Sequence, residues 1–290
     1  MSESESWTGD AVTNPVTKIV LALVHSNVFI ALAATSWVVT TVVLVELPVD
    51  PIPPLIVFVV TLFVYSLNRF TDIDEDEYNV PARASFTKQY GRAILAIGVV
   101  GYLGVVVLAV ARGIPRAELL LAPLVVIGLY SVVGLKEILL VKNLLVGIAW
   151  GGIPLGVGVY YGVASEPEIV VLTAYVVAMV TVAAAIFDLK DIVGDRREGI
   201  RTIPRVFGTR WTRIGAATAT VVVTLWLFAV VSRGIVPARY LVLVSFSAYV
   251  FAYSVLADPD ASPLFYGFVV DGEHLFLAAV VIALGALGIL

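Results

Sequence analysis

Long apolar runs alternate with short polar stretches along almost the whole chain. From Lys18 onward nine runs occur, each close to the ~20 residues that a helix needs to cross the hydrocarbon of a bilayer. They lie at 19–44, 54–70, 93–111, 118–134, 143–163, 168–188, 213–231, 239–257 and 273–290. The runs are continuous and lack the strict alternation of transmembrane barrel strands. The pattern therefore predicts an all-α integral membrane protein with about nine transmembrane helices, the first long enough to tilt or to contain a broken end.

Composition supports the same interpretation. Of the 290 residues, 60% are hydrophobic and 14% are charged, and the mean hydropathy is +1.01. Soluble domains are about 45–50% apolar and about 25% charged, so these values exclude a soluble enzyme, a disordered protein and a collagen-like fibre. The lack of cysteine excludes disulfides, thiolate metal sites and cysteine nucleophiles. The net charge of −4 argues against a nucleic-acid partner, and no feature indicates an obligate protein partner.

The basic residues indicate how the chain lies in the membrane. Residues 1–17 are polar and acidic, and we interpret them as a cytoplasmic tail that precedes one transmembrane domain, 18–290. With the N-terminus inside the cell, fourteen of the 18 Lys and Arg residues fall on the cytoplasmic side. This bias is the one that orients proteins in membranes. We therefore expect a plasma-membrane protein whose Asp-rich loops face the cytoplasm.

Two segments concentrate acidic residues, each at the predicted cytoplasmic end of an even-numbered span. The first acidic segment, 68–83, contains Asn68, Asp72 and Asp76, and the second, 188–204, contains Asp188, Asp191 and Asp195. At ~100° per residue on a helix, the first three side chains fall within an arc of about 80° and the second three within about 60°. Each span is thus predicted to end in a row of oxygen ligands on one face, and Pro81 and Pro204 to stop the helices.

Such rows need a compensating cation. Like charges spaced at i and i+4 destabilise a helix, and ionised Asp is costly near hydrocarbon. Mg²⁺ binds carboxylates and commonly bridges them to substrate phosphates, so the two rows predict a Mg²⁺ and diphosphate site. An acidic loop in solvent is the alternative for either segment alone. The excess negative charge of such a site requires converging basic side chains, for which the candidates are Arg83, Lys136, Lys142, Arg196 and Arg201.

The two segments resemble the signatures of the UbiA superfamily of intramembrane prenyltransferases. The family motifs read N-D-x-x-D-x-x-x-D and D-x-x-D-x-x-x-D. The first is matched by Asn68, Asp72 and Asp76, and the second by Asp188, Asp191 and Asp195. The stretch 199–204 and the sequence around Tyr130, Lys136 and Lys142-Asn143 also look like the family.

This resemblance implies nine transmembrane helices around a central cavity and a transferase of prenyl groups. It implies transfer from an allylic prenyl diphosphate to a lipophilic acceptor within the membrane, with Mg²⁺ as cofactor at both motifs. Membrane lipid surrounds the protein in this interpretation. Asp72 and Asp191 are then catalytic through the metal, which neutralises charge on the departing diphosphate. Arg and Lys share that charge, Arg by bidentate contact and Lys as a point charge.

One position departs from the family pattern. Where the family has Asp after the Asn, this chain has Arg69. The change removes one metal oxygen and adds a cation, which could contact diphosphate instead. Asp74 is an unconvincing substitute because it lies about 160° from Asp76 on an ideal helix.

Four further residues are candidates for the reaction centre. The ring of Tyr130 could shield an allylic cation, or it could belong to the interfacial aromatic belt. His25, Ser26 and Asn27 are polar residues inside the first span and could contact the head of the acceptor, with His25 accepting a proton. A plain interhelical hydrogen bond is the alternative for these three residues.

The acceptor and one other function class stay open. An ether-lipid precursor, a quinone ring and a carotenoid are all compatible with the sequence. A multi-span secondary transporter with a cytoplasmic-side ion site is the alternative function. Transporter sites lie near the midplane, often between inverted repeats, whereas both acidic segments here fall on one side.

Overall fold

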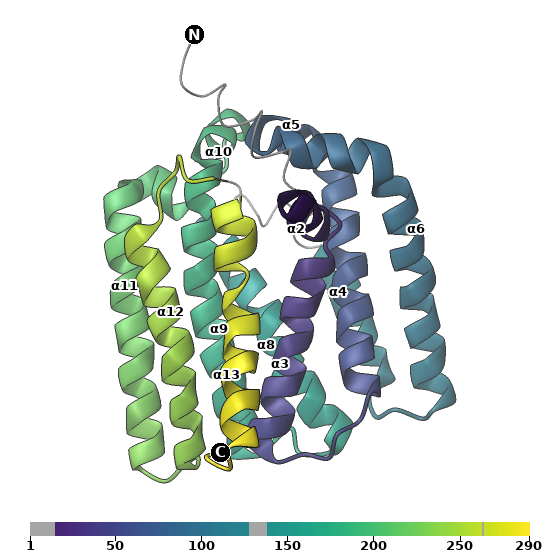
Figure 1. Ribbon diagram of the computed structural model, residues 1–290, viewed down its shortest axis with the longest axis vertical. Coiled ribbons are helices and arrows are strands. Elements are labelled where there is room, and N and C mark those ends of the chain that lie inside the picture. The colour runs from purple at the N-terminus through teal and green to yellow at the C-terminus, as the bar shows by residue number, and fades with distance from the viewer. Residues whose placement is uncertain (1–14, 128–137, 263) are drawn as a thin grey trace.

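The computed structural model describes residues 15–127, 138–262 and 264–290. Its helices form an upright bundle (Figure 1). The long ones are α3 (Val28–Val45), α4 (Ile52–Thr71), α6 (Pro81–Ala111), α8 (Val141–Tyr161), α9 (Pro167–Phe187), α11 (Ile203–Ser232), α12 (Leu243–Leu256) and α13 (Glu273–Ala286). The short ones are α2 (Pro15–His25), α5 (Ile73–Asn79), α7 (Ala122–Ile127) and α10 (Ile192–Glu198). Within the described residues, eight helices are long and apolar enough to cross a membrane.

The eight helices confirm the all-helical membrane fold, and the expected count of about nine agrees roughly. The fourth predicted span, 118–134, begins as a 3₁₀ turn, Ala117–Leu121, followed by α7. Its remainder lies outside the described residues. The first predicted span is broken as anticipated: α2 ends at His25, and α3 begins at Val28 after Asn27, whose φ of 63° is left-handed. In Figure 1 α2 is seen end-on, so its axis lies roughly at right angles to those of the long helices.

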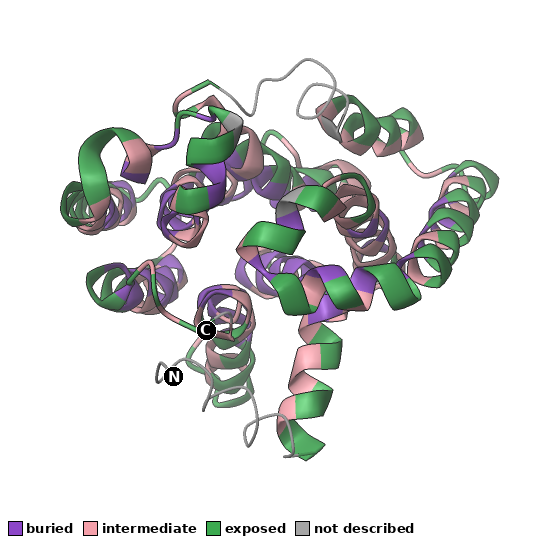
Figure 2. Ribbon diagram, turned by 90° about the horizontal axis from the view of Figure 1, so that it is seen from above, coloured by how far each residue is buried: buried purple, intermediate pink, exposed green. Residues whose placement is uncertain are grey.

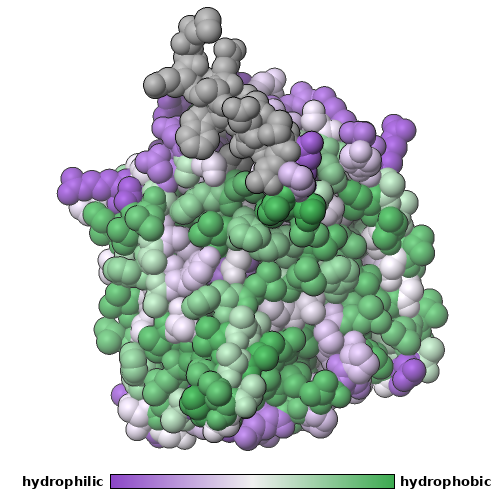
Figure 3. Space-filling view, in the orientation of Figure 1, coloured by the Kyte–Doolittle hydropathy of each residue, from purple (hydrophilic) through white to green (hydrophobic). Residues whose placement is uncertain are grey.

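The helices pack as a ring around a central space (Figure 2). Going round the ring, the contacts join α4, α3, α13, α12, α11, α9, α8 and α7, and α7 closes it against α4. Helix α6 packs outside α4. The main hydrophobic core lies where α3, α9, α12 and α13 meet, around Trp37, Tyr175 and Phe246. The face of the molecule seen in Figure 3 is apolar over most of its height, as expected for a surface that contacts lipid.

Helix α8 approaches α9 closely because glycines face it. A Cβ on Gly147 would lie 2.5 Å from the carbonyl oxygen of Val177, and one on Gly151 would lie 3.2 Å from that of Thr173. Neither position has room for a side chain, and small residues of this kind let two helices pack closely. This contact brings the start of α8 against the end of α9.

The acidic segments form the short elements at one end of the bundle. Helix α5 ends at Asn79 and α10 ends at Glu198, so both stop before their prolines as predicted. Pro81 is in fact the first residue of α6 and Pro204 the second of α11, positions where proline lacks only an amide hydrogen that would be unpaired anyway. Gly194 of α10 packs against the side chain of Asn79, so α5 and α10 touch over this end. We call it the α5/α10 end.

Candidate active site

A cavity of about 330 Å³ lies inside the ring at the α5/α10 end. Its lining includes Asn68, Asp72, Asp76, Asp188 and Asp191, so five of the six predicted metal ligands converge on one space. Four basic side chains line it as well: Arg69, Arg83, Lys142 and Lys190. The walls include apolar side chains of α4, α8 and α9. The cavity thus combines charged groups with an apolar interior.

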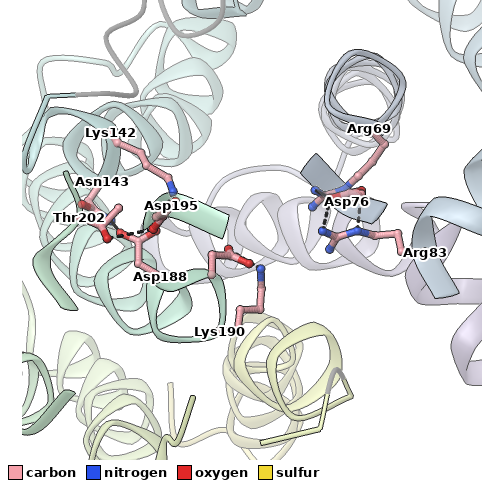
Figure 4. A network of polar contacts seen from close by, with 10 residues as sticks. Arg69, Asp76, Arg83, Lys142, Asn143, Asp188, Lys190, Asp195 and Thr202 are labelled. Carbon is pink, nitrogen blue, oxygen red and sulfur yellow. Dashed lines mark hydrogen bonds and ion pairs between the residues drawn. The ribbon is translucent and has the colours of Figure 1, made fainter. Parts of the chain in front are cut away.

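The second acidic segment enters the cavity at the end of α9. Residues Asp188–Asp191 form a 3₁₀ turn, and because side chains at i and i+3 eclipse in that geometry, Asp188 and Asp191 share a face. Lys142 Nζ lies 2.8 Å from Asp188 Oδ1, and Asn143 Nδ2 donates to Asp188 Oδ2 at 2.8 Å. Lys190 Nζ lies 2.6 Å from Asp191 Oδ2. Each carboxylate therefore has a donor from this chain beside it (Figure 4).

Two carboxylate oxygens of this segment have no donor. Asp191 Oδ1 and Asp195 Oδ1 are buried and have no hydrogen-bond partner among the described residues. Thr202 Oγ1 donates to the other oxygen of Asp195 at 2.9 Å. Asp195 is fully buried and is absent from the described cavity lining. A buried acceptor without a donor is costly, so this segment has room for a cationic ligand.

The first acidic segment is arranged differently. Arg83 contacts Asp76 with both ends of its guanidinium, Nε to Oδ2 at 2.8 Å and Nη2 to Oδ1 at 2.5 Å. Arg69 Nη1 lies 3.7 Å from Asp76 Oδ1. Figure 4 shows these three residues as one group across from Asp188 and Asp195, with Lys190 between them. Arg69 Nε is buried and has no partner among the described residues.

The two segments differ in their fit to Mg²⁺. No group of three or more His, Asp and Glu residues in the described chain is placed as a ready metal site. The second segment nevertheless offers unpaired carboxylate oxygens, the donors that Mg²⁺ prefers. The oxygens of Asp76 are held by a guanidinium, so this residue is not available as a ligand in the arrangement seen here. The predicted metal site at the first motif therefore depends on Asn68 and Asp72 alone.

The comparisons with known proteins agree with this geometry. The family model described as the UbiA prenyltransferase family matches residues 29–270. The chain belongs to the UbiA prenyltransferase family. It is accordingly an integral membrane prenyltransferase. A search of curated proteins finds no match.

Three solved structures share the UbiA fold with this chain. A UbiA homolog from Aeropyrum pernix K1 superposes with a TM-score of 0.65 at 18% identity, covering 90% of this chain and 98% of that one. A UbiA homolog from Archaeoglobus fulgidus bound to GPP and Mg²⁺ gives 0.62 at 14% identity, covering 91% and 98%. A structure of digeranylgeranylglyceryl phosphate synthase gives 0.54 at 17% identity, covering 94% and 98%.

Several predicted residues of this UbiA protein lie elsewhere. Arg196, on α10, and Arg201, between α10 and α11, are exposed and are not among the described lining residues. Ser26 donates to the carbonyl of Leu23 and is likewise outside that lining. Tyr130 and Lys136 lie outside the described residues.

The predicted acceptor-side residues His25 and Asn27 do line the cavity, close to the arginines. Asn27 Nδ2 donates to Ser66 Oγ at 3.4 Å, the interhelical bond that was the alternative interpretation. Burial, followed by the charges of Arg83 and Arg69, lowers the pKa of His25 to about 4. Its imidazole is therefore neutral at physiological pH.

Sequence reasoning missed an important group at the start of α13. Asp271, Glu273 and His274 all line the cavity, although none of them was among the predicted site residues. Lys190 lines it as well and was not predicted either. A signal was present, since three ionisable residues within four positions at the start of an apolar span indicate function.

Proposed function

We propose that this UbiA protein transfers a prenyl group from an allylic prenyl diphosphate to a lipophilic acceptor and uses Mg²⁺ to do so. The diphosphate is bound at the α5/α10 end, and the prenyl chain lies against the apolar wall of the cavity. The observation that carries this proposal is the convergence of four basic residues and five predicted metal ligands on one cavity with an apolar interior. A prenyl diphosphate has the same division into an anionic head and an apolar chain.

We assign the diphosphate to the four cations that line the cavity. Lys142 and Lys190 are held by Asp188 and Asp191, so each ammonium is already positioned beside a carboxylate. Arg83 is held by Asp76, and the unpaired Nε–H of Arg69 is free to donate to a phosphate oxygen. Guanidinium and ammonium groups in a low-dielectric site stabilise phosphate charge strongly.

Asp188, Asp191 and Asp195 would hold Mg²⁺, with Asn68 and Asp72 on the other side of the cavity. When bound, Mg²⁺ would neutralise the charge that develops on the departing diphosphate. Lys142 and Lys190 would then shift from their carboxylates toward phosphate oxygens. Aromatic residues that line the cavity, among them Tyr65, Trp150 and Phe187, would help to exclude water from the reacting prenyl group.

The orientation in the cell is also a proposal. The α5/α10 end bears most of the basic residues of the loops, and basic loops remain in the cytoplasm. We place this end at the cytoplasmic face of the plasma membrane, where a water-soluble diphosphate head can reach the cavity. The transporter alternative receives no support from the family assignment.

The test is a reaction in nanodiscs. Purified protein is given geranyl or geranylgeranyl diphosphate, Mg²⁺ and acceptors of the lipid, quinone-ring and carotenoid classes, and diphosphate release and product mass are followed. We expect Mg²⁺-dependent release that is coupled to a prenylated product. Absence of release from both diphosphates by correctly folded protein would contradict the proposal.

Two matched lysine variants distinguish an effect in the cavity from an effect at the protein surface. Lys190→Met removes a cavity cation, whereas Lys88→Met removes a cation that pairs with Glu77 on the exposed side of α5 and α6. Release should fall in the first variant and stay unchanged in the second.

A further inference from the structure

The first acidic segment has two guanidinium groups packed beside its acids. Arg69 stands where the family motif has Asp, and it lines the cavity. Its Nη1 lies 3.7 Å from Asp76 Oδ1, the oxygen that Arg83 Nη2 contacts at 2.5 Å. Arg83 Nε donates to the other oxygen of Asp76 at 2.8 Å. Two arginines therefore share one carboxylate, and the group of three carries an excess positive charge (Figure 4).

The other acids of the cavity do not cancel this excess by contact. Asp191 and Asp271 are near enough for their charges to act on the arginines. Within the described chain, however, neither of them forms an ion pair with Arg69 or Arg83. The imidazole of His25 beside the arginines is neutral. Among the residues that the structure describes, the two guanidinium groups are thus paired with a single carboxylate.

This arrangement opposes a divalent cation at the first segment. The amide of Asp72 donates to the carbonyl oxygen of Asn68, so the backbone is still helical between them. Arg69 and Asp72 are three residues apart, and side chains at that spacing are neighbours on a helix. Mg²⁺ bound to Asp72 or Asp76 would therefore lie beside a guanidinium. Arginine stays protonated in proteins, and like charges repel strongly in a site of low dielectric.

The cations of the second segment leave room for a metal. Its two lysines each contact one oxygen of a carboxylate, and an ammonium is a point charge on a flexible stem that can move aside. Asp191 Oδ1 and Asp195 Oδ1 are buried without a partner among the described residues. In the first segment, by contrast, the fork of Arg83 takes both oxygens of Asp76. The two segments thus differ in whether a cation can be added.

Arg69 also has an unpaired donor. Its Nε is buried and has no hydrogen-bond partner among the residues that the structure describes. An unpaired buried donor is costly, and a phosphate oxygen is a strong acceptor for a guanidinium. Positive charge directed at the diphosphate oxygens is what a metal would supply at this place. The two arginines supply it without a metal.

We propose that the first acidic segment binds no Mg²⁺ and that Arg69 and Arg83 replace the metal there. The prenyl diphosphate is then held between a single Mg²⁺ at the second segment and the two guanidinium groups, whereas the resemblance to the family implied Mg²⁺ at both motifs. This inference rests on the diphosphate site proposed above. Asn68 and Asp72 line the cavity without a metal of their own.

Counting bound metal tests this inference without any turnover. Protein in phosphatidylcholine nanodiscs is titrated with Mn²⁺, which takes the same oxygen ligands as Mg²⁺. The diphosphate is geranylgeranyl S-thiolodiphosphate, a slowly reacting analogue, and free Mn²⁺ is measured by electron paramagnetic resonance. We expect one Mn²⁺ per chain. Arg69→Asp restores the acid of the family motif and removes the cation, so it should bind two, with coupled spins because one diphosphate bridges them.

A matched control makes the same change of charge away from the cavity. Arg92 lies on α6, is exposed and is not among the described lining residues. Arg92→Asp should therefore still bind one Mn²⁺. Two Mn²⁺ in the wild type, or one in correctly folded Arg69→Asp, would overturn the inference.

A second variant keeps the test decisive if Arg69→Asp does not fold. Arg69→Gln removes the cation without adding an acid, and Arg83 still holds Asp76, so the count should stay at one Mn²⁺. Its affinity for inorganic diphosphate in the absence of metal should fall about tenfold, as for loss of one charged hydrogen bond. An affinity equal to that of the wild type would show that Arg69 does not replace a metal, and the inference would fail.

The wild-type protein separates this inference from the proposed function. If it binds one Mn²⁺ together with inorganic diphosphate but transfers no prenyl group, the prenyl-transfer proposal fails and the single-metal site stands. If it transfers prenyl groups with two Mn²⁺ bound, the inference fails and the proposed function stands. Absence of bound Mn²⁺ would contradict both.

Discussion

The two acidic segments have nearly the same spacing of carboxylates but form different kinds of site. In the first, Asp76 is enclosed by Arg83 and Arg69, and its oxygens are occupied. In the second, Asp191 pairs with Lys190 through one oxygen and Asp195 accepts from Thr202, and the other oxygen of each has no partner among the residues that the structure describes. Whether a spaced set of acids can bind a metal therefore depends on the cations packed against it as much as on the acids themselves.

The largest effect is expected at the second segment. Asp191→Asn removes the charge beside Lys190 and should lower the rate of diphosphate release by about 10³-fold, since it weakens both the metal site and the position of a cation. Release from geranylgeranyl diphosphate at saturating Mg²⁺ measures this. Asp74→Asn is the control, because Asp74 is exposed and outside the described lining. A comparable loss of diphosphate release in Asp191→Asn and Asp74→Asn would show that the effect is not particular to the second acidic segment.

A smaller effect is expected at the first segment. Arg83→Gln breaks the bidentate pair and should lower kcat/KM by about 10²-fold, in the range for loss of a charged hydrogen-bonding partner. It should also lower the thermal unfolding temperature, because it leaves Asp76 buried without its main counter-charge. Arg92→Gln, farther along α6, is the matched control and should change neither quantity. An unchanged kcat/KM in Arg83→Gln would assign the pair a structural role alone.

Variants of Arg69 test the difference between the two acidic segments most directly, because Arg69 is where the first segment departs from the family motif. Arg69→Asp restores the acid of the family motif and removes the cation, so we expect the KM for prenyl diphosphate to rise about tenfold, as for loss of one charged contact. The Mg²⁺ concentration for half-maximal release should fall, because the first segment gains a carboxylate. Arg69→Ala should raise KM without changing the Mg²⁺ dependence. Equal or higher activity in Arg69→Asp at unchanged KM would show that Arg69 does not contact diphosphate.

The smallest effect is expected from a supporting hydrogen bond. Thr202→Val removes the donor to Asp195 and leaves the shape of the side chain, so release should slow by about threefold to tenfold, in line with one buried hydrogen bond. Thr224→Val, on the part of α11 remote from the cavity, is the control. A loss as large as that of Asp191→Asn would place Thr202 in the reaction centre itself.

The sequence predicted the helical membrane fold well and the site in part. The apolar runs predicted the spans because the hydrophobicity of a segment by itself indicates that the segment is buried in the membrane, whatever the other segments are. The break in the first span was anticipated from its length, and the acidic spacing identified five residues that line the cavity. Arg196 and Arg201 were placed in the site by proximity in sequence, but Arg196 on α10 and Arg201 after that helix are both exposed.

The surroundings of the start of α13 could not be predicted in the same way. Glu273 and His274 acquire their environment from Trp37, Trp150 and Phe246, which belong to three other helices. Periodicity along one helix contains no information about these partners. The ionisable residues alone indicated that the start of α13 is unusual.

By itself the sequence determined that the chain spans a membrane, where its helices run and which acids are spaced to meet a cation, because hydrophobicity and helical periodicity are local properties. Only the tertiary structure decided which acids are available. Asp76 loses its free oxygens to Arg83 on the next helix, and Asp188 meets Lys142 and Asn143 from a helix 45 residues earlier. The physical reason is that ion pairing depends on distances of a few ångström between side chains, and the packing of the helices sets those distances.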